Sequence, residues 1–142
     1  MTDRQPAGGR RLSREEALKG LYRMQVTGDD AARVVDDIQG DPAVGEDAAS
    51  YAVHLVTLFD LNRDDIDAQL AGWLDKWEPS RLAQIDRAVL RLAVTELLFT
   101  PDTPVKVILD EAIELAKRFG SHESGRFVNG VLDRAARTVR GL

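Results

Sequence analysis

The first residues that could do chemistry are three arginines, Arg10, Arg11 and Arg14, followed by Tyr22. Guanidinium groups bind phosphates, and an exposed tyrosine ring stacks on an unpaired base. At helical spacing Arg10 and Arg14 share one side while Arg11 points elsewhere, so the group suits single-stranded RNA. An equally open interpretation is that Tyr22 belongs to the core and the arginines only keep a helix end soluble.

No other set of residues resembles a catalytic or metal centre. The sequence has no cysteine, its two histidines, His54 and His122, are far apart, and it has no glycine-rich phosphate loop. Zinc sites and nucleophilic catalysis need several such groups at defined spacing. We therefore expect no enzyme activity, no metal and no cofactor. His54 lies in an apolar segment and is expected in the core.

Charge is unevenly distributed along the 142 residues, whose net charge is −5. Residues 1–23 and 117–140 are basic, whereas residues 29–67 are acidic. Such a chain can bind an anionic and a cationic partner on different surfaces, although solvated faces without partners give the same pattern. The sequence has no secretory signal and no apolar run of about 20 residues, so we expect a cytoplasmic protein that does not enter the membrane.

Apolar residues recur every three or four positions over most of the chain, which predicts helices. Ser13 and Glu16 form a capping-box pair that is expected to open the first helix. Trp73 and Trp77, four residues apart, are expected to pack in the core. The predicted helices cover about residues 13–28, 30–39, 46–61, 62–77, 82–97, 104–119 and 121–140.

The predicted fold is all-α, with six to seven helices joined by short connections. Residues 1–9 have no apolar period and are expected to form a flexible tail. Residues 10–142 are expected to form a single domain of two small packed bundles, covering about 10–78 and 79–140. The helix ending near residue 97 has apolar residues on two faces, so it is expected to be central, with Leu92 in the core.

The pair Asn129-Gly130 is a strong hairpin signal when alternating apolar residues flank it. Here the flanking apolar residues follow a helical period instead, so we expect a helix. A glycine inside a helix is about 1 kcal/mol less favourable than alanine, which suggests close approach of another backbone or a partner at Gly130. Asn129 would then offer an amide to a buried network or to an external ligand.

Three segments carry a resemblance to a known family: "IDRAVLRLAVTELLF", "PVKVILDEAIELAKRFG" and "RFVNGVLDRAA". Together with the N-terminal "RRLSREEALKGLYRMQVTG", they resemble the bacterial NusB family of transcription antitermination factors over the whole chain. The resemblance implies an all-helical fold of two small bundles and RNA binding without catalysis. It further implies binding to the boxA element of ribosomal RNA transcripts, in a heterodimer with the ribosomal protein NusE, which joins the elongating RNA polymerase and assists rRNA maturation.

The resemblance also assigns residues to these roles. It implies that Arg10, Arg11, Arg14 and Tyr22 of the first helix and Glu123, Arg126, Phe127 and Asn129 of the last helix face RNA. It implies that Asp86 lies on an acidic surface met by the basic ribosomal partner. Three departures from the family pattern are a thinner arginine run, Gly20 in place of the usual alanine, which is expected to loosen the helix, and Gly125 in place of a bulkier polar residue.

Two other functions compete with RNA binding. A self-associating helical module without direct RNA binding, such as a homodimer that hides the basic surface, is compatible with the same sequence. A NusB-like module of an rRNA cytosine methyltransferase would instead be followed by a glycine-rich cofactor loop, which these residues lack.

Overall fold

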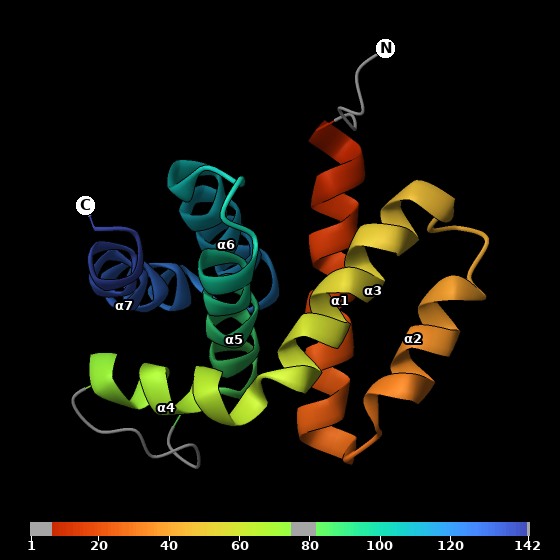
Figure 1. The fold of residues 1–142 in the computed structure, drawn as a ribbon, viewed down its shortest axis with the longest axis horizontal. Helices are drawn as coiled ribbons and strands as arrows, with labels where there is room; N and C mark the ends of the chain where they lie inside the picture. The colour runs from red at the N-terminus through yellow and green to blue at the C-terminus, as the bar shows by residue number, and fades with distance from the viewer. Residues whose placement is uncertain (1–6, 75–81, 142) are drawn as a thin grey trace.

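The protein, represented by a computed structural model, is described for residues 7–74 and 82–141, and within these ranges it is entirely helical (Figure 1). The helices are α1 (Ala7–Thr27), α2 (Ala31–Gln39), α3 (Glu46–Leu61), α4 (Arg63–Trp73), α5 (Gln84–Phe99), α6 (Val105–Phe119) and α7 (His122–Arg140). The predicted all-α class is confirmed, and the predicted and observed helices agree closely from α2 onward. Trp77 and the expected bundle boundary near residues 78–80 lie outside the described residues.

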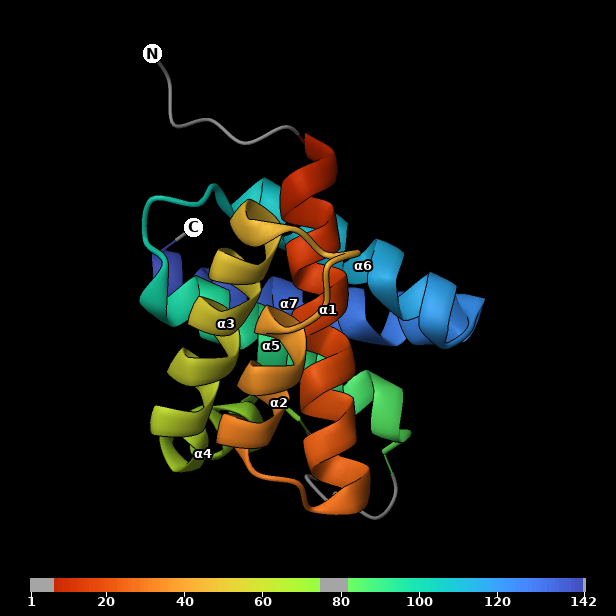
Figure 2. The same ribbon diagram turned by 90° about the vertical axis from the view of Figure 1, so that its right-hand side faces the viewer.

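The helices form two packed groups, as predicted. Helices α1, α2 and α3 pack together, and so do α5, α6 and α7, while α4 packs mainly against α5 and α7. Contacts of α5 with α1 and α3 join the groups. Figure 1 shows the first group on the right and the second, with α4 beneath it, on the left. In the rotated view of Figure 2, the ends of α6 and α7 where the two helices meet project to the right, past α1.

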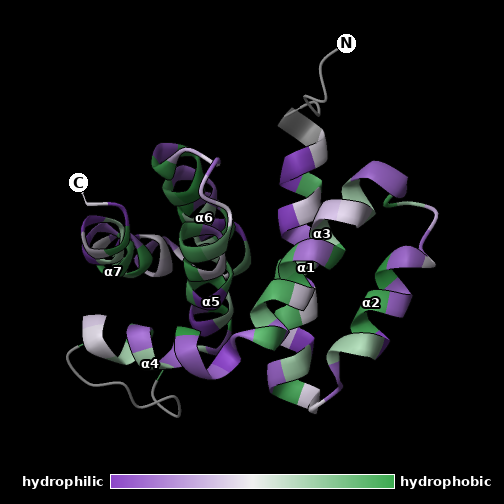
Figure 3. Ribbon diagram, in the orientation of Figure 1, coloured by the Kyte–Doolittle hydropathy of each residue, from purple (hydrophilic) through white to green (hydrophobic). Residues whose placement is uncertain are grey.

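Helix α5 is central because its apolar residues cover more than one face. Every residue from 88 to 97 is buried, including Leu92 at 2% exposure. Helix α2 is amphipathic: it buries Val34 and Ile38, and its hydrophobic side faces α1 and α3 in Figure 3. Gly20 of α1 is buried at this contact, and a methyl group there would lie 2.7 Å from Cγ1 of Val34. The absence of a side chain thus permits close packing, and the predicted loosening of the helix at Gly20 is not what the packing shows.

Three local predictions are wrong. Helix α1 begins at Ala7, so residues 7–9 of the expected tail are helical, while residues 1–6 lie outside the described residues. Ser13 lies inside the helix, where it caps nothing. Its hydroxyl instead donates to the carbonyl oxygens of Gly9 and Ala48, at 2.9 and 2.8 Å, and fastens α1 to α3. His54 is exposed on α3 because the apolar stripe of that helix faces away from it.

The end of α5 is closed by a residue from the end of the chain. The guanidinium of Arg140 donates to five backbone carbonyl oxygens between residues 96 and 103, at distances of 2.9 to 3.5 Å. These include the carbonyl of Leu97 in the last turn of α5 and that of Glu96, which also accepts the backbone N–H of Thr100 at 3.0 Å. The contact fastens α7 to the α5–α6 connection. Among the described residues, no helix is both long and apolar enough to cross a membrane.

Candidate nucleic-acid interface

The first turns of α1 place two arginines at the surface on different sides of the helix. The guanidinium carbon of Arg10 lies 3.8 Å from the centre of the Tyr51 ring on α3. Arg11 faces α6 and forms a two-point ion pair with Glu111, with N–O distances of 3.1 and 3.0 Å. This pair raises the pKa of Arg11. The predicted divergence of Arg10 and Arg11 is therefore observed.

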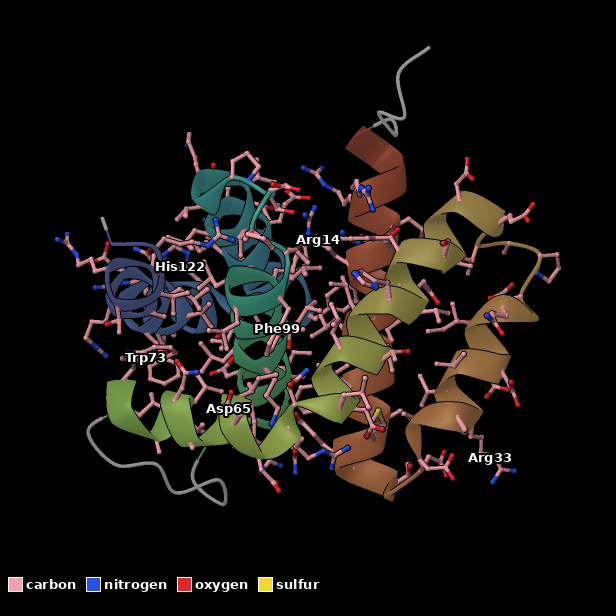
Figure 4. All side chains as sticks on the ribbon, in the orientation of Figure 1. Arg14, Arg33, Asp65, Trp73, Phe99 and His122 are labelled. Carbon is pink, nitrogen blue, oxygen red and sulfur yellow. The ribbon has the colours of Figure 1, made fainter. Side chains whose placement is uncertain are left out.

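Arg14 is not at the surface, although the sequence placed it there. Its side chain is 5% exposed and donates two hydrogen bonds to Glu96 of α5, at 2.8 and 2.9 Å. Burial alone would lower the pKa of Arg14, but the hydrogen bond and charge of Glu96 outweigh it and raise the pKa above its ordinary value. Figure 4 shows Arg14 directed from α1 toward the second group of helices. A direct contact of Arg14 with RNA is thus excluded by its position, because its donors already serve Glu96.

Tyr22 lies further along α1 and is 40% exposed, so the interpretation that placed it in the core is wrong. It lines an open groove of about 500 Å³. The other lining residues described come from α1, the start of α5 and the end of α6: Leu18, Lys19, Ala83, Gln84, Ile85 and Phe119. Phe119 is 38% exposed. Two aromatic rings and a lysine on an open groove are suited to stacking on bases and binding phosphate.

The start of α7 lies next to this groove, directly after the end of α6. Ser121 caps α7 by accepting a hydrogen bond from the backbone N–H of Ser124 at 3.1 Å. Gly125 is buried against the side chain of Lys117, so its small size brings α6 and α7 close together. The predicted RNA-facing side chains of Glu123, Arg126, Phe127 and Asn129 are all exposed.

The exposed side chains at the start of α7 have no partner within the described residues. Within the described residues, Arg126 and Asn129 make no side-chain hydrogen bond, and Phe127 is 37% exposed. Asn129 therefore points to solvent and not into a buried network. A methyl group added at Gly130 would have no atom within 4 Å. Close approach of another described backbone segment at Gly130 was therefore a wrong expectation, and close approach of a partner there stays a prediction.

Asp86 does not form the acidic surface that the sequence predicted. It lies in the first turn of α5, where a negative charge is favourable, but it is only 8% exposed. One of its carboxylate oxygens is fully buried and has no hydrogen-bond partner. Burial without a partner is unfavourable, and this oxygen has no donor among the described residues.

Sequence reasoning missed several residues of this face. Lys19 and Phe119 line the groove, and Arg118 forms an ion pair with Glu15 that joins the end of α6 to α1. The run "AKRFG" at the end of a predicted helix, with two basic residues and an aromatic one, was the available signal. Groups of three or more His, Cys, Asp or Glu side chains placed to hold a metal ion are absent from the described residues.

Comparisons with known proteins agree with this geometry. The sequence profile of the NusB family matches residues 11–137. A transcription antitermination protein NusB from Desulfitobacterium hafniense (strain DSM 10664 / DCB-2) is 39% identical over 132 residues, covering 92% of this chain and 89% of the relative. Among solved structures, T. maritima NusB has a TM-score of 0.84 and 38% identity, covering 94% of this chain and 92% of that one.

A second solved structure contains a complex. It holds the antitermination factors NusB and NusE with double-stranded RNA, and one of its chains superposes with a TM-score of 0.84 at 26% identity. The match covers 94% of the present chain and 99% of that chain.

Proposed function

Because the chain belongs to the NusB family, we propose that it is a transcription antitermination factor that binds RNA together with NusE. The RNA is the boxA element of ribosomal RNA transcripts, and the complex assists rRNA synthesis and maturation. The elongating RNA polymerase is an indirect partner, and the protein acts in the cytoplasm without catalysing a reaction. The observation that carries this proposal is that arginine and aromatic side chains reach the surface on α1 and at the start of α7, where Arg10 is half-buried and Arg11, Tyr22, Arg126 and Phe127 are exposed.

The RNA-binding surface comprises residues from both helices. Their side chains offer guanidinium groups for phosphates, aromatic rings for stacking and an amide for base edges. The residues are Arg10, Arg11, Tyr22, Glu123, Arg126, Phe127 and Asn129. Glu123 accepts hydrogen bonds from base amino groups, and Arg14 contributes only by fixing α1 on α5.

Binding of NusE uses the region around Asp86. The unpartnered oxygen of Asp86 supports this assignment, because no hydrogen bond or ion pair within the described residues holds the side chain in place. A change of rotamer would bring the carboxylate toward the surface, where a basic side chain of a ribosomal protein can pair with it.

A direct test is titration of a short boxA-like single-stranded RNA with the protein alone and with purified NusE, at two salt concentrations. We expect weak binding by the protein alone and much tighter binding with NusE. If roughly three to five phosphates are neutralised, the logarithm of the binding constant falls with the logarithm of salt at a slope of about −2 to −3.5. Tight, salt-insensitive binding by the isolated protein would contradict this proposal, as would no binding under any condition.

Variants locate the site. Arg10→Ala combined with Arg11→Ala should weaken RNA binding and leave the thermal unfolding temperature nearly unchanged, since both side chains lie at the surface. Arg33→Ala is the matched control, because Arg33 is an exposed arginine on α2, apart from Arg14 in Figure 4. If the control loses as much affinity as the double variant, the binding is a response to net charge and not to this surface.

The alternative function, a self-associating interaction module, predicts a different result. Sedimentation would then show a stable homodimer, RNA would not bind, and loss of Arg10 and Arg11 would have little effect on association.

A further inference from the structure

The two arginines at the start of α1, Arg10, which is half-buried, and Arg11, which is exposed, have different surroundings. Arg11 has its charge compensated by Glu111, whereas Arg10 has no ion pair or side-chain hydrogen bond within the described residues. The contact that holds Arg10 is the Tyr51 ring, 3.8 Å from its guanidinium carbon. All donors of Arg10 therefore remain free, while those of Arg11 are partly used.

The Tyr51 ring is itself fixed from below. Its hydroxyl donates a 2.8 Å hydrogen bond to Oε2 of Glu96, the carboxylate that also accepts from Arg14. The ring is part-buried and belongs to α3, so it does not move with α1 alone. A chain of contacts thus runs from the buried pair of Arg14 and Glu96 through Tyr51 to Arg10, whose guanidinium packs on the Tyr51 ring.

A guanidinium on an aromatic face is attracted to the ring and loses much of its rotational freedom in the free protein. Arg10 is half-buried, and within the described residues its N–H groups make no hydrogen bond. Binding to a phosphate or stacking on a base then requires less ordering of a long side chain, which favours affinity. This requires a planar cation, and lysine does not provide one.

We propose that Tyr51 is a positioning residue for RNA binding: by holding Arg10 flat against the edge of α3, it extends the RNA-binding surface from α1 onto α3. This inference rests on the proposed function. Tyr51 need not touch the RNA, because it acts through Arg10.

The test is a set of variants titrated with the boxA-like RNA in the presence of NusE: Tyr51→Phe, Tyr51→Leu, Arg10→Ala and the double variant Tyr51→Leu/Arg10→Ala. Tyr51→Phe keeps the ring and should bind RNA as the unmodified protein does. Tyr51→Leu removes the ring and should lose affinity about two- to fivefold, the range expected of an exposed cation–π contact. In the Arg10→Ala background, Tyr51→Leu should cause no further loss.

Arg10→Lys gives a second measurement that leaves the buried network untouched. It keeps the charge but not the planar stack, so it should lose affinity to a similar extent as Tyr51→Leu. Unchanged binding by both Tyr51→Leu and Arg10→Lys would overturn the positioning role, as would an equal loss on Tyr51→Leu with and without Arg10. Absence of RNA binding by the unmodified protein would instead overturn the proposed function, and the positioning role with it.

Discussion

The guanidinium of Arg14 and the carboxylate of Glu96 form two hydrogen bonds, at 2.8 and 2.9 Å, across the contact between α1 and α5. Both side chains are almost fully buried, at 5% and 2% exposure. The pair lies where the two groups of helices meet, and Tyr51 adds a third hydrogen bond to the same carboxylate. Glu96, on α5 of the second group, is thus bound by two helices of the first group, α1 and α3.

Removing one member of this pair should therefore affect folding more than RNA contact. We expect Glu96→Gln to lower the free energy of unfolding by about 3–5 kcal/mol, because the charge of Arg14 is left buried and uncompensated. Urea denaturation would measure the loss. Glu111→Gln is the control, since it removes the partner of the exposed Arg11 and should change stability little. Equal stability of the two variants would contradict the assigned role of Glu96.

The position of Leu92 gives a prediction for the core. Leu92→Ala should lower the free energy of unfolding by about 2–5 kcal/mol, because the truncated side chain leaves a cavity at the centre of the fold. Val107→Ala, on the exposed face of α6 where Val107 is 40% exposed, should stay within about 0.5 kcal/mol. A Leu92→Ala protein as stable as the unmodified one would mean that α5 is not central.

The helices were predictable because their signals are local. Apolar spacing, Gly28 and Gly120 near helix ends, and the break at "TPDTP" need no knowledge of distant residues. The burial of Arg14 was not predictable from local spacing. Its partner is 82 residues away, and a helical arginine beside two exposed ones has the same local pattern whether it is buried or solvated. The one signal was Glu96, a charge inside the apolar run "AVTELLF".

The exposed residues of the candidate interface were predicted only in part, because some of them depend on local spacing and others on how the helices pack. The exposure of Arg126 and Asn129 agrees with the period of α7. The same period grouped Phe127 with the apolar face, yet Phe127 is 37% exposed. The burial of Asp86 and the exposure of His54 depend on which face of α5 or α3 meets a neighbour. Apolar residues on several faces leave that choice open until the helices are packed.

Replacing Gly20 and Gly130, two glycines within helices, by alanine should change the free energy of unfolding in opposite directions. Gly20→Ala should lower the free energy of unfolding by about 1–3 kcal/mol, since the new methyl group would meet the stiff side chain of Val34 at 2.7 Å. Gly130→Ala should raise it by up to about 1 kcal/mol, because the space is open and alanine favours the helix. Thermal or urea unfolding distinguishes the pair. Stabilisation by Gly20→Ala would show that α1 and α2 are packed less closely than described.

Tyr51 predicts a dependence of stability on alkaline pH. Burial, followed by the charge of Glu96, raises the pKa of Tyr51 above its ordinary value. The folded state therefore disfavours tyrosinate, and the stabilising contribution is complete below the ordinary pKa of about 10 and is lost as pH rises through the raised pKa. In a Tyr22→Phe variant, Tyr51 is the one remaining tyrosine, and the ultraviolet absorbance of its tyrosinate form should appear at a higher pH than in a free tyrosine peptide. A midpoint at or below that of the peptide would contradict the burial of this hydroxyl beside Glu96.

The hydrogen bonds of Arg140 predict that this side chain stabilises the α5–α6 connection. Arg140→Ala should lower the free energy of unfolding by about 1–3 kcal/mol, because several carbonyl oxygens lose a charged donor. Arg140→Lys should restore only part of this, since an ammonium cannot reach several carbonyls with the planar fork of a guanidinium. Amide hydrogen exchange should quicken at Thr100 and Thr103 in the alanine variant. Arg137→Ala, which removes an exposed arginine one turn earlier in α7, should leave that exchange unchanged. Slow exchange retained in Arg140→Ala would show that the connection is held by other contacts.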